Sequence, residues 1–291
     1  MKKIIENTSP SVYSFMSVIS HLVSYNRRNK ISASSGLKPL IINDLIHKKK
    51  SDTLFILGSG SSINHISDKL WHRISEMDSI GLNFWILHDF VPTFLKFELP
   101  LRDNQERSKL FSEYFEDKWQ LYEKSTLIYN HYNDEQPLPA FIKSKLEIKD
   151  FYFPKYLYVP GTLESTVEMN LNSYFNYIKF FQSKSILFAK TGSLISTISI
   201  GLLLDYKNIV LCGVDLSDTK YFFDDNYYKS KFPDIDADQP GEVHLTIDKS
   251  KKSITIDTII KILNYINVKR GNNIFIENSS SVLSNILPVY N

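Results

Sequence analysis

The chain has 291 residues, 43% of them hydrophobic, and its 34 basic residues stand against 32 acidic ones. This length is enough for one large domain with a sizeable core. The near balance of charge gives no positive field that would favour a nucleic-acid partner. Cys212 is the single cysteine, so intramolecular disulfides are excluded, and its place in an apolar run predicts a buried thiol.

No apolar signal region opens the chain, and no run reaches the roughly 18 apolar residues of a membrane span. We therefore expect a cytoplasmic protein, with residues 1–50 as an extension to a main domain at residues 51–291. In the extension, Val12–Tyr25 has apolar residues at helical spacing and is followed by the basic pair Arg27 and Arg28. Such a helix can lie on the inner face of the inner membrane, pack against the main domain or bind a second copy of the chain.

One stretch organises the rest of the chain, namely Thr53–Leu57 followed by a glycine- and serine-rich run that ends at Ser62. The first part predicts a buried parallel strand, and the second predicts a tight turn that opens a helix. Glycine lets a backbone approach a ligand closely, and N–H groups at a helix N-terminus favour an anion. Gly58, Ser59 and Gly60 are therefore candidate phosphate-binding residues. The alternative is a plain strand-to-helix turn capped by a serine.

The same stretch is a poor dinucleotide fingerprint. The third glycine of G-x-G-x-x-G is replaced by Ile63. About twenty residues later, where an acidic residue should hold a ribose, the chain has Asn83. A nucleotide site is still expected at this turn, whereas a nicotinamide site is not.

Strands alternate with helices through the rest of the chain. The expected strands are residues 79–83, 90–97, 126–129, 156–159, 186–189, 208–213 and 273–277, and the expected helices are residues 63–74, 102–124, 171–181, 194–204, 255–268 and 281–286. This alternation predicts an α/β fold with a Rossmann-like, doubly wound and largely parallel sheet. Ligands bind such sheets beyond the carboxyl ends of the strands. The candidate residues on that rim are Gly58, Ser59, Gly60, Asn83, Thr191, Gly192, Ser193 and Asp215.

Residues 214–254 interrupt the alternation with a long segment rich in Asp, Lys, Tyr and Pro. A connection of this length in a compact domain is usually a lid or a binding loop, with disorder as the alternative. Its run Asp234-Ile-Asp236-Ala-Asp238 invites a metal site, but the Gly and Glu that an EF-hand loop requires are missing. We therefore expect a solvated acidic loop and no metal.

His244, in the same segment, is the histidine best placed for chemistry. An imidazole with a pKa of about 6.5 can take a proton from a hydroxyl group at neutral pH, although a lone histidine is more often structural. The chain has no zinc-type spacing of histidines or cysteines, no P-loop and no G-x-S-x-G elbow. Hydrolase and nucleotide-triphosphatase chemistry is therefore not expected.

In order and spacing, several segments resemble the bacterial sialyltransferases of glycosyltransferase family 42, which build the outer sugars of lipooligosaccharide. The segments that carry this resemblance are Gly58–Ser62, Gly81–Phe84, Lys190–Ser193, Leu211–Asp215, Tyr221–Asp224, His244 and Ile276–Asn285. They are similar to the family's Gly-Asn-Gly-Pro-Ser turn, its Asn-Gln-Phe segment, its Thr-Ser-Gly helix start and its Gly-Ile-Asp strand end. Further on they are similar to its Tyr-Ala-Phe-Asp lid, the histidine that closes the lid and its Pro-Asn-Ser tail. The likeness begins at about Thr53 and leaves residues 1–50 without a counterpart.

The resemblance implies a CMP-activated donor of a sialic-acid-type sugar, a glycan hydroxyl as acceptor, inversion in a single displacement, and neither metal nor other cofactor. It implies that His244 removes the proton of the acceptor as general base. Tyr221 would donate a hydrogen bond to the departing phosphate in place of a cation. The rim residues would hold CMP, with Asp215 orienting the nucleotide or anchoring the lid.

Two departures from the family leave the donor open. Ser59 stands in place of an asparagine, and Ser217 stands in place of a second lid tyrosine, for which Tyr227 or Tyr228 would have to substitute. Another CMP-ulosonate, such as that of Kdo, legionaminic acid or pseudaminic acid, is therefore an alternative donor. Two functions of other classes also stay open. One is a metal-dependent nucleotide-sugar transferase that uses the acidic run of the lid, and the other is a non-catalytic nucleotide- or glycan-binding protein.

Overall fold

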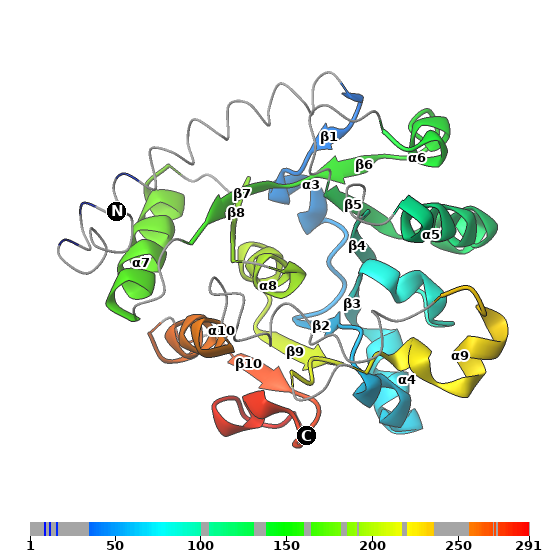
Figure 1. The fold of residues 1–291 in the computed structure, drawn as a ribbon. Helices are drawn as coiled ribbons and strands as arrows, with labels where there is room; N and C mark the ends of the chain where they lie inside the picture. The colour runs from blue at the N-terminus through cyan, green and yellow to red at the C-terminus, as the bar shows by residue number, and fades with distance from the viewer. Residues whose placement is uncertain are drawn as a thin grey trace.

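The computed structural model describes residues 9, 12, 16, 35–99, 105–130, 138–159, 164–181, 185–190, 192–216, 220–235, 256–269, 271 and 273–290. Within these residues, parallel strands form an eight-stranded sheet in the order β1-β6-β5-β4-β3-β2-β9-β10 (Figure 1). The strands are β1 (Lys38–Pro39), β2 (Thr53–Leu57), β3 (Asp78–Leu82), β4 (Phe94–Glu98), β5 (Thr126–Asn130), β6 (Phe151–Phe153), β9 (Asn208–Cys212) and β10 (Asn273–Ile276). A separate parallel pair consists of β7 (Lys155–Tyr158) and β8 (Ile186–Ala189).

Helices cover both faces of the large sheet (Figure 1). On one face lie α3 (Ile42–Ile46), α7 (Glu164–Phe181), α8 (Ser193–Leu203) and α10 (Ile256–Asn264), which continues as the π-turn η5 (Tyr265–Lys269). On the other lie α4 (Asp68–Glu76), α5 (Gln105–Asp117), α6 (Ala140–Lys145) and α9 (Asn226–Lys231). Short 3₁₀ turns are η1 (Ser61–His65), η2 (Asn83–Leu87), η3 (Trp119–Tyr122), η4 (Phe222–Asp224) and η6 (Val282–Asn285).

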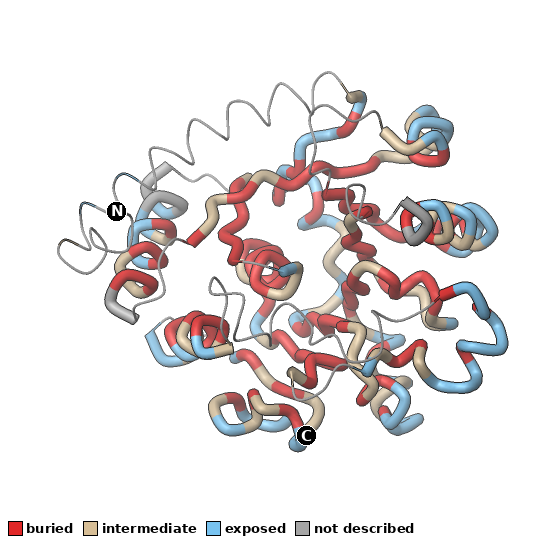
Figure 2. The backbone as a smooth tube through the Cα atoms, viewed as in Figure 1, coloured by how far each residue is buried: buried red, intermediate tan, exposed pale blue. Residues whose placement is uncertain are grey.

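Strand β2 shows why the sheet must be covered on both faces. All five of its residues are buried, as Figure 2 shows for most of the central strands. Successive side chains of a strand point to opposite faces, so Leu54 and Ile56 enter the core under α8, while Phe55 and Leu57 enter the core under α4 and α5. The predicted α/β class with a doubly wound, largely parallel sheet is therefore confirmed.

The chain changes direction in the sheet between β2 and β9. From β2 it proceeds through β3, β4 and β5 to β6, which lies next to the edge strand β1, and it later returns to place β9 and β10 on the other side of β2. Leu54 consequently pairs with Ile209 although they are far apart in sequence. In such sheets, the crevice beyond the carboxyl ends of the strands at this reversal is where ligands bind. The loops after β2 and β9 meet at that point.

Three features differ from the sequence expectations. Part of the expected extension belongs to the sheet, because β1 pairs with β6 and Ile42 and Leu45 of α3 are fully buried in the core. Residues 156–159 and 186–189 form their own two-stranded sheet rather than joining the large one. The first part of the expected lid contains the short helical elements η4 and α9.

The expected amphipathic helix at residues 12–25 lies outside the described residues, except for Val12 and Met16. The later part of the lid, residues 236–255, also lies outside them. Among the helices that the structure describes, none is both long enough and apolar enough to cross a membrane.

Candidate functional site

The turn after β2 packs directly on the turn after β9. The N–H of Gly58 donates to the carbonyl oxygen of Cys212 at 2.8 Å, and the N–H of Gly60 donates to that of Gly213 at 2.8 Å. The N–H of Ser62 donates to the carboxylate of Asp215 at 3.0 Å. Three of the five amides in this predicted phosphate cradle therefore already have acceptors within the protein.

The two glycines of the turn are required by this contact. A Cβ atom on Gly58 would lie 2.5 Å from the carbonyl oxygen of Gly213, and one on Gly60 would lie 2.4 Å from the carboxylate of Asp215. Real Cβ atoms do not approach other atoms so closely, so only glycine fits. The contact between these two turns of the protein therefore explains both glycines, and no bound ligand is needed to explain them.

Asp215 is central to this contact. Its side chain is 7% exposed, and besides its bond to Ser62 its backbone carbonyl accepts from the hydroxyl group of Ser281 at 3.2 Å. Glu277, just after β10, lies near it. Burial, and secondarily the charge of Asp215, raises the pKa of the Glu277 carboxyl to about 7. Two acidic side chains therefore lie on this part of the rim.

Tyr221 reaches the same turn from the lid. It forms an antiparallel bridge with Gly60, and the N–H of Phe222 donates to the carbonyl oxygen of Ser59 at 2.9 Å. The side-chain amide of Asn64 donates to the carbonyl oxygen of Phe222 at 2.9 Å and so ties η1 to η4. The structure thus brings together Gly58, Ser59, Gly60, Asp215 and Tyr221, which the sequence analysis singled out separately.

Asn83 lies on the same rim, directly after β3. Its φ of +50° falls in the left-handed region, which asparagine tolerates better than most residues. Its side-chain oxygen is buried and has no hydrogen-bond partner among the described residues. The backbone conformation therefore accounts for the choice of asparagine.

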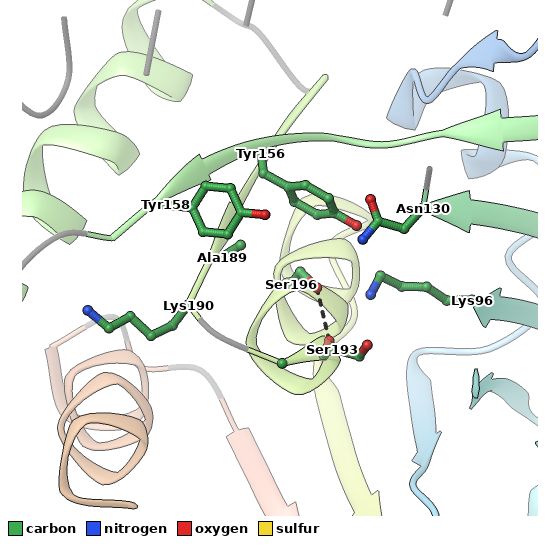
Figure 3. A pocket seen from close by; sticks show the side chains of 9 residues that line it. Lys96, Asn130, Tyr156, Tyr158, Ala189, Lys190, Ser193 and Ser196 are labelled. Carbon is green, nitrogen blue, oxygen red and sulfur yellow. Dashed lines mark hydrogen bonds between the residues drawn. The ribbon is translucent and has the colours of Figure 1, made fainter. Parts of the chain in front are cut away.

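A cavity of about 150 Å³ opens where α8 begins (Figure 3). It is enclosed by the carboxyl ends of β4 and β5, by the β7–β8 pair and by the first turn of α8. The residues in its wall include Lys96, Asn130, Tyr156, Lys190, Gly192 and Ser193. Gly192 and Ser193 are therefore brought to a cavity, as a binding site requires, while Thr191 lies outside the described residues.

The start of α8 suits an anion. Gly192 has a φ of +85°, which favours glycine, and no side chain caps the helix in the described part of the chain. The hydroxyl groups of Ser196 and Thr197 donate back to the carbonyl oxygen of Ser193, at 2.9 and 2.6 Å. Because no side chain caps α8 in the described part of the chain, its first N–H groups are left for a ligand, and the helix dipole favours negative charge at this end.

Sequence reasoning missed Lys96, which lies in the wall of this cavity. Its side chain is 2% exposed, and burial lowers the pKa of its ammonium group to about 8. The one available signal was a lysine in the middle of the otherwise apolar run Phe94-Leu-Lys-Phe97. Asn130, from the next strand, was missed as well, because a strand-terminal asparagine is common and carries no motif.

Other candidates are not assembled in the described structure. His244, Asp236 and Asp238 lie outside the described residues. Asp234 is exposed, and no group of acidic, histidine or cysteine side chains within the described ranges could hold a metal ion. Tyr227, considered as a second lid tyrosine, donates its hydroxyl to the exposed Asp89 at 2.5 Å.

No protein-family model matches the sequence, and no curated protein sequence matches it. The structure is similar to solved sialyltransferases of Campylobacter jejuni. The monofunctional α-2,3-sialyltransferase Cst-I is 17% identical, with a TM-score of 0.44 over 82% of this chain and 80% of that one. CstII in complex with CMP-3FNeuAc is 17% identical, with a TM-score of 0.42 over 81% of this chain and 85% of that one.

Proposed function

We propose that this chain is a glycosyltransferase that moves a sialic-acid-type sugar from its CMP donor to a hydroxyl group of a surface glycan such as lipooligosaccharide. The transfer inverts the anomeric carbon in a single step and uses no metal. CMP-Kdo or another CMP-nonulosonate is the alternative donor. The glycan acceptor and the CMP-sugar are the partners that this function requires.

The contact between Tyr221 and Gly60 is the observation that supports this proposal most directly. Two segments that resemble the same family, and that are far apart in sequence, meet at the rim where α/β sheets bind nucleotides. The bridge is a backbone contact, and the ring of Tyr221 stacks on that of Phe223. In this proposal the hydroxyl group of Tyr221 donates a hydrogen bond to the leaving phosphate, where charge develops in the transition state.

The roles of the remaining residues follow from their chemistry. The sugar carbon becomes cation-like as CMP leaves, and His244 accepts the proton of the attacking hydroxyl group. The β2 turn can offer a phosphate at most the amides of Ser59 and Ser61, since its other amides have acceptors within the protein. The carboxylate of Asp215 disfavours an anion at Ser62, so a phosphate bound at this turn would lie over Ser59 and beside Tyr221.

Release of CMP tests the proposal. The purified protein is incubated with a lipooligosaccharide acceptor and either CMP-N-acetylneuraminate or CMP-Kdo, with and without EDTA. We expect release with one of the two donors, unchanged by EDTA. Loss of activity in EDTA would instead favour the metal-dependent transferase, and binding of CMP without turnover of either donor would favour a non-catalytic protein.

Three variants test the roles of individual residues. His244→Ala should lower transfer by about 100-fold or more while CMP still binds, as expected for a general base.

Tyr221→Phe should lower kcat by about 100-fold, because one donor to the leaving group is lost. Tyr227→Phe is the matched control and should transfer normally, since its hydroxyl group is bound to Asp89.

A further inference from the structure

The proposed reaction gives no role to Lys96, although its burial is costly. Phe94 and Lys96 lie on the same face of β4, and Phe94 belongs to the core under α8. Among the described residues the ammonium group of Lys96 makes no hydrogen bond or close ion pair, although the carboxylate of Glu98, two residues along the same strand, attracts it. The nearest aromatic ring is that of Tyr156, with its centroid 6.0 Å away. A buried and unpaired ammonium group costs free energy unless something binds it.

The groups around Lys96 define what would bind it. Figure 3 shows its side chain directed toward Ser193 and Asn130 within the cavity. The hydroxyl oxygen of Ser193 and the side-chain oxygen of Asn130 have no hydrogen-bond partner in the described part of the chain. Lys190 is different, because its ammonium group donates to the carbonyl oxygen of Val159 at 2.9 Å.

These groups form two kinds of contact side by side. The first kind donates hydrogen bonds and comes from Lys96, the hydroxyl group of Ser193 and the uncapped first turn of α8. Lys96 is positively charged and the first turn of α8 is the positive end of the helix dipole, so these groups suit an oxyanion. The side-chain amide of Asn130 donates to Glu98 at 3.2 Å, which leaves its oxygen to accept from a hydroxyl group.

We propose that Lys96, together with Ser193 and the first turn of α8, binds an oxyanion of the ligand, and that Asn130 accepts a hydrogen bond from a hydroxyl group beside it. The cavity of about 150 Å³ equals about five water molecules at ~30 Å³ each, which is room for a carboxylate or phosphate and an adjoining hydroxyl-bearing carbon. Only the source of the oxyanion rests on the proposed function. It is either the carboxylate of the donor's sugar acid or the phosphate of CMP.

Lys96→Met tests this subsite, because methionine keeps most of the side-chain length and removes the charge. Calorimetry with CMP and with CMP-N-acetylneuraminate distinguishes the two sources. If the oxyanion is the carboxylate, the variant binds the CMP-sugar about 10- to 100-fold more weakly than the wild type and binds CMP equally well. If it is the phosphate, both ligands are weakened to the same degree.

Lys118→Met is the matched control. Lys118 is also a partly buried lysine, but its ammonium group donates to the carbonyl oxygens of Leu87 and His88, both at 3.3 Å. Its removal should leave both affinities unchanged. If Lys96→Met has no more effect than Lys118→Met on either ligand, the subsite is overturned.

Thermal unfolding separates a failure of the subsite from a failure of the proposed function. Lys96→Met should have a Tm at pH 7 no lower than the wild type, since a buried charge is removed. Asn130→Asp is a second variant. It supplies a carboxylate beside Lys96 and should also lower the affinity for the ligand. If CMP and the CMP-sugar fail to bind but inorganic phosphate raises the Tm of the wild type and not of Lys96→Met, the subsite stands and the proposed function falls.

Discussion

At the scale of single residues, two positions of the rim show how backbone demands and ligand chemistry select the same residue types. Gly60 is required by the approach of Asp215, and Asn83 suits a left-handed backbone. Either residue would also suit a nucleotide site, so its presence in the sequence does not distinguish a requirement of the backbone from a contact with a ligand. Substitutions that separate the two causes are therefore informative.

A pair of substitutions at Asn83 separates backbone strain from ligand binding. Asn83→Gly keeps the positive φ accessible, so its free energy of unfolding should stay close to that of the wild type. Asn83→Ala should be less stable than Asn83→Gly by about 1 kcal/mol, because alanine resists this conformation. Urea unfolding measures both. Equal stability of the two variants would contradict the role of the backbone, while an equal loss of CMP affinity in both would identify the amide as a ligand contact.

Glu277 should make stability depend on pH. Its pKa is raised to about 7 by burial and by Asp215, so between about pH 4.5 and pH 7 the folded chain holds a proton that the unfolded chain releases. The stability that this proton contributes is complete below pH 4.5 and is lost as the pH rises to about 7. Because the group is only half-buried, we expect a loss of about 1 kcal/mol.

Glu277→Gln removes this titration and provides the measurement. The difference in free energy of unfolding between the variant and the wild type, followed by urea unfolding at pH 5 and pH 8, should shift by about 1 kcal/mol in favour of the variant at pH 8. A difference that does not change with pH would show that Glu277 keeps an ordinary pKa in the folded chain.

At the scale of elements, the turn after β2 and the turn after β9 act as one unit. Their backbones are joined by two hydrogen bonds of 2.8 Å, and the carboxylate of Asp215 occupies the N-terminus of η1. An anion site at that helix end is thus filled by the protein itself. The beginning of α8 differs from it, because no side chain of the described residues caps that helix.

Gly60→Ala should separate these two turns. Its Cβ would meet the carboxylate of Asp215 at 2.4 Å, so one turn has to move, at a cost of about 1–3 kcal/mol in the free energy of unfolding. The bridge to Tyr221 is lost with it, and transfer activity should fall together with stability. Ser61→Ala, in the same turn, is the control and should change stability by less than about 0.5 kcal/mol. Similar stabilities for the two variants would rule out the steric explanation.

At the scale of the whole molecule, the described sheet forms a single packed unit that includes residues 38–46. Ile42 and Leu45 are fully buried in the core that also contains residues of α8 and α10. Trp85 and Trp119 lie in the core on the opposite face. Unfolding should therefore be cooperative across both faces.

Ile42→Ala tests this cooperativity. It should lower the free energy of unfolding by about 2–5 kcal/mol, since it leaves a cavity where a fully buried side chain was. The midpoint seen by tryptophan fluorescence, which reports on the opposite face, should shift together with the midpoint seen by circular dichroism. A fluorescence transition that stays in place would mean that α3 unfolds separately from the sheet.

Most of the fold was accessible to sequence reasoning, because strand and helix periods are local. The runs at residues 53–57, 126–129 and 208–213 are apolar without alternation, which indicates strands buried on both faces, and the structure has strands there. β1, β6 and α6 were not predicted, because their short runs show no clear hydrophobic period. The position of the glycine turn and Asp215 on one rim was also predictable, since both follow strands of one parallel sheet, whereas their direct contact depends on β2 and β9 being neighbours.

Sequence alone thus determined the α/β class, the parallel sheet and the rim on which several candidate residues lie, because each depends on patterns within a few turns of chain or on a general rule of sheet topology. Only tertiary structure decided the strand order, the separate β7–β8 pair and the state of Lys96. Whether a lysine is buried, and whether anything pairs with it, depends on β5, β7 and α8, which are distant in sequence. Contacts between distant segments are the interactions that local periodicity does not encode.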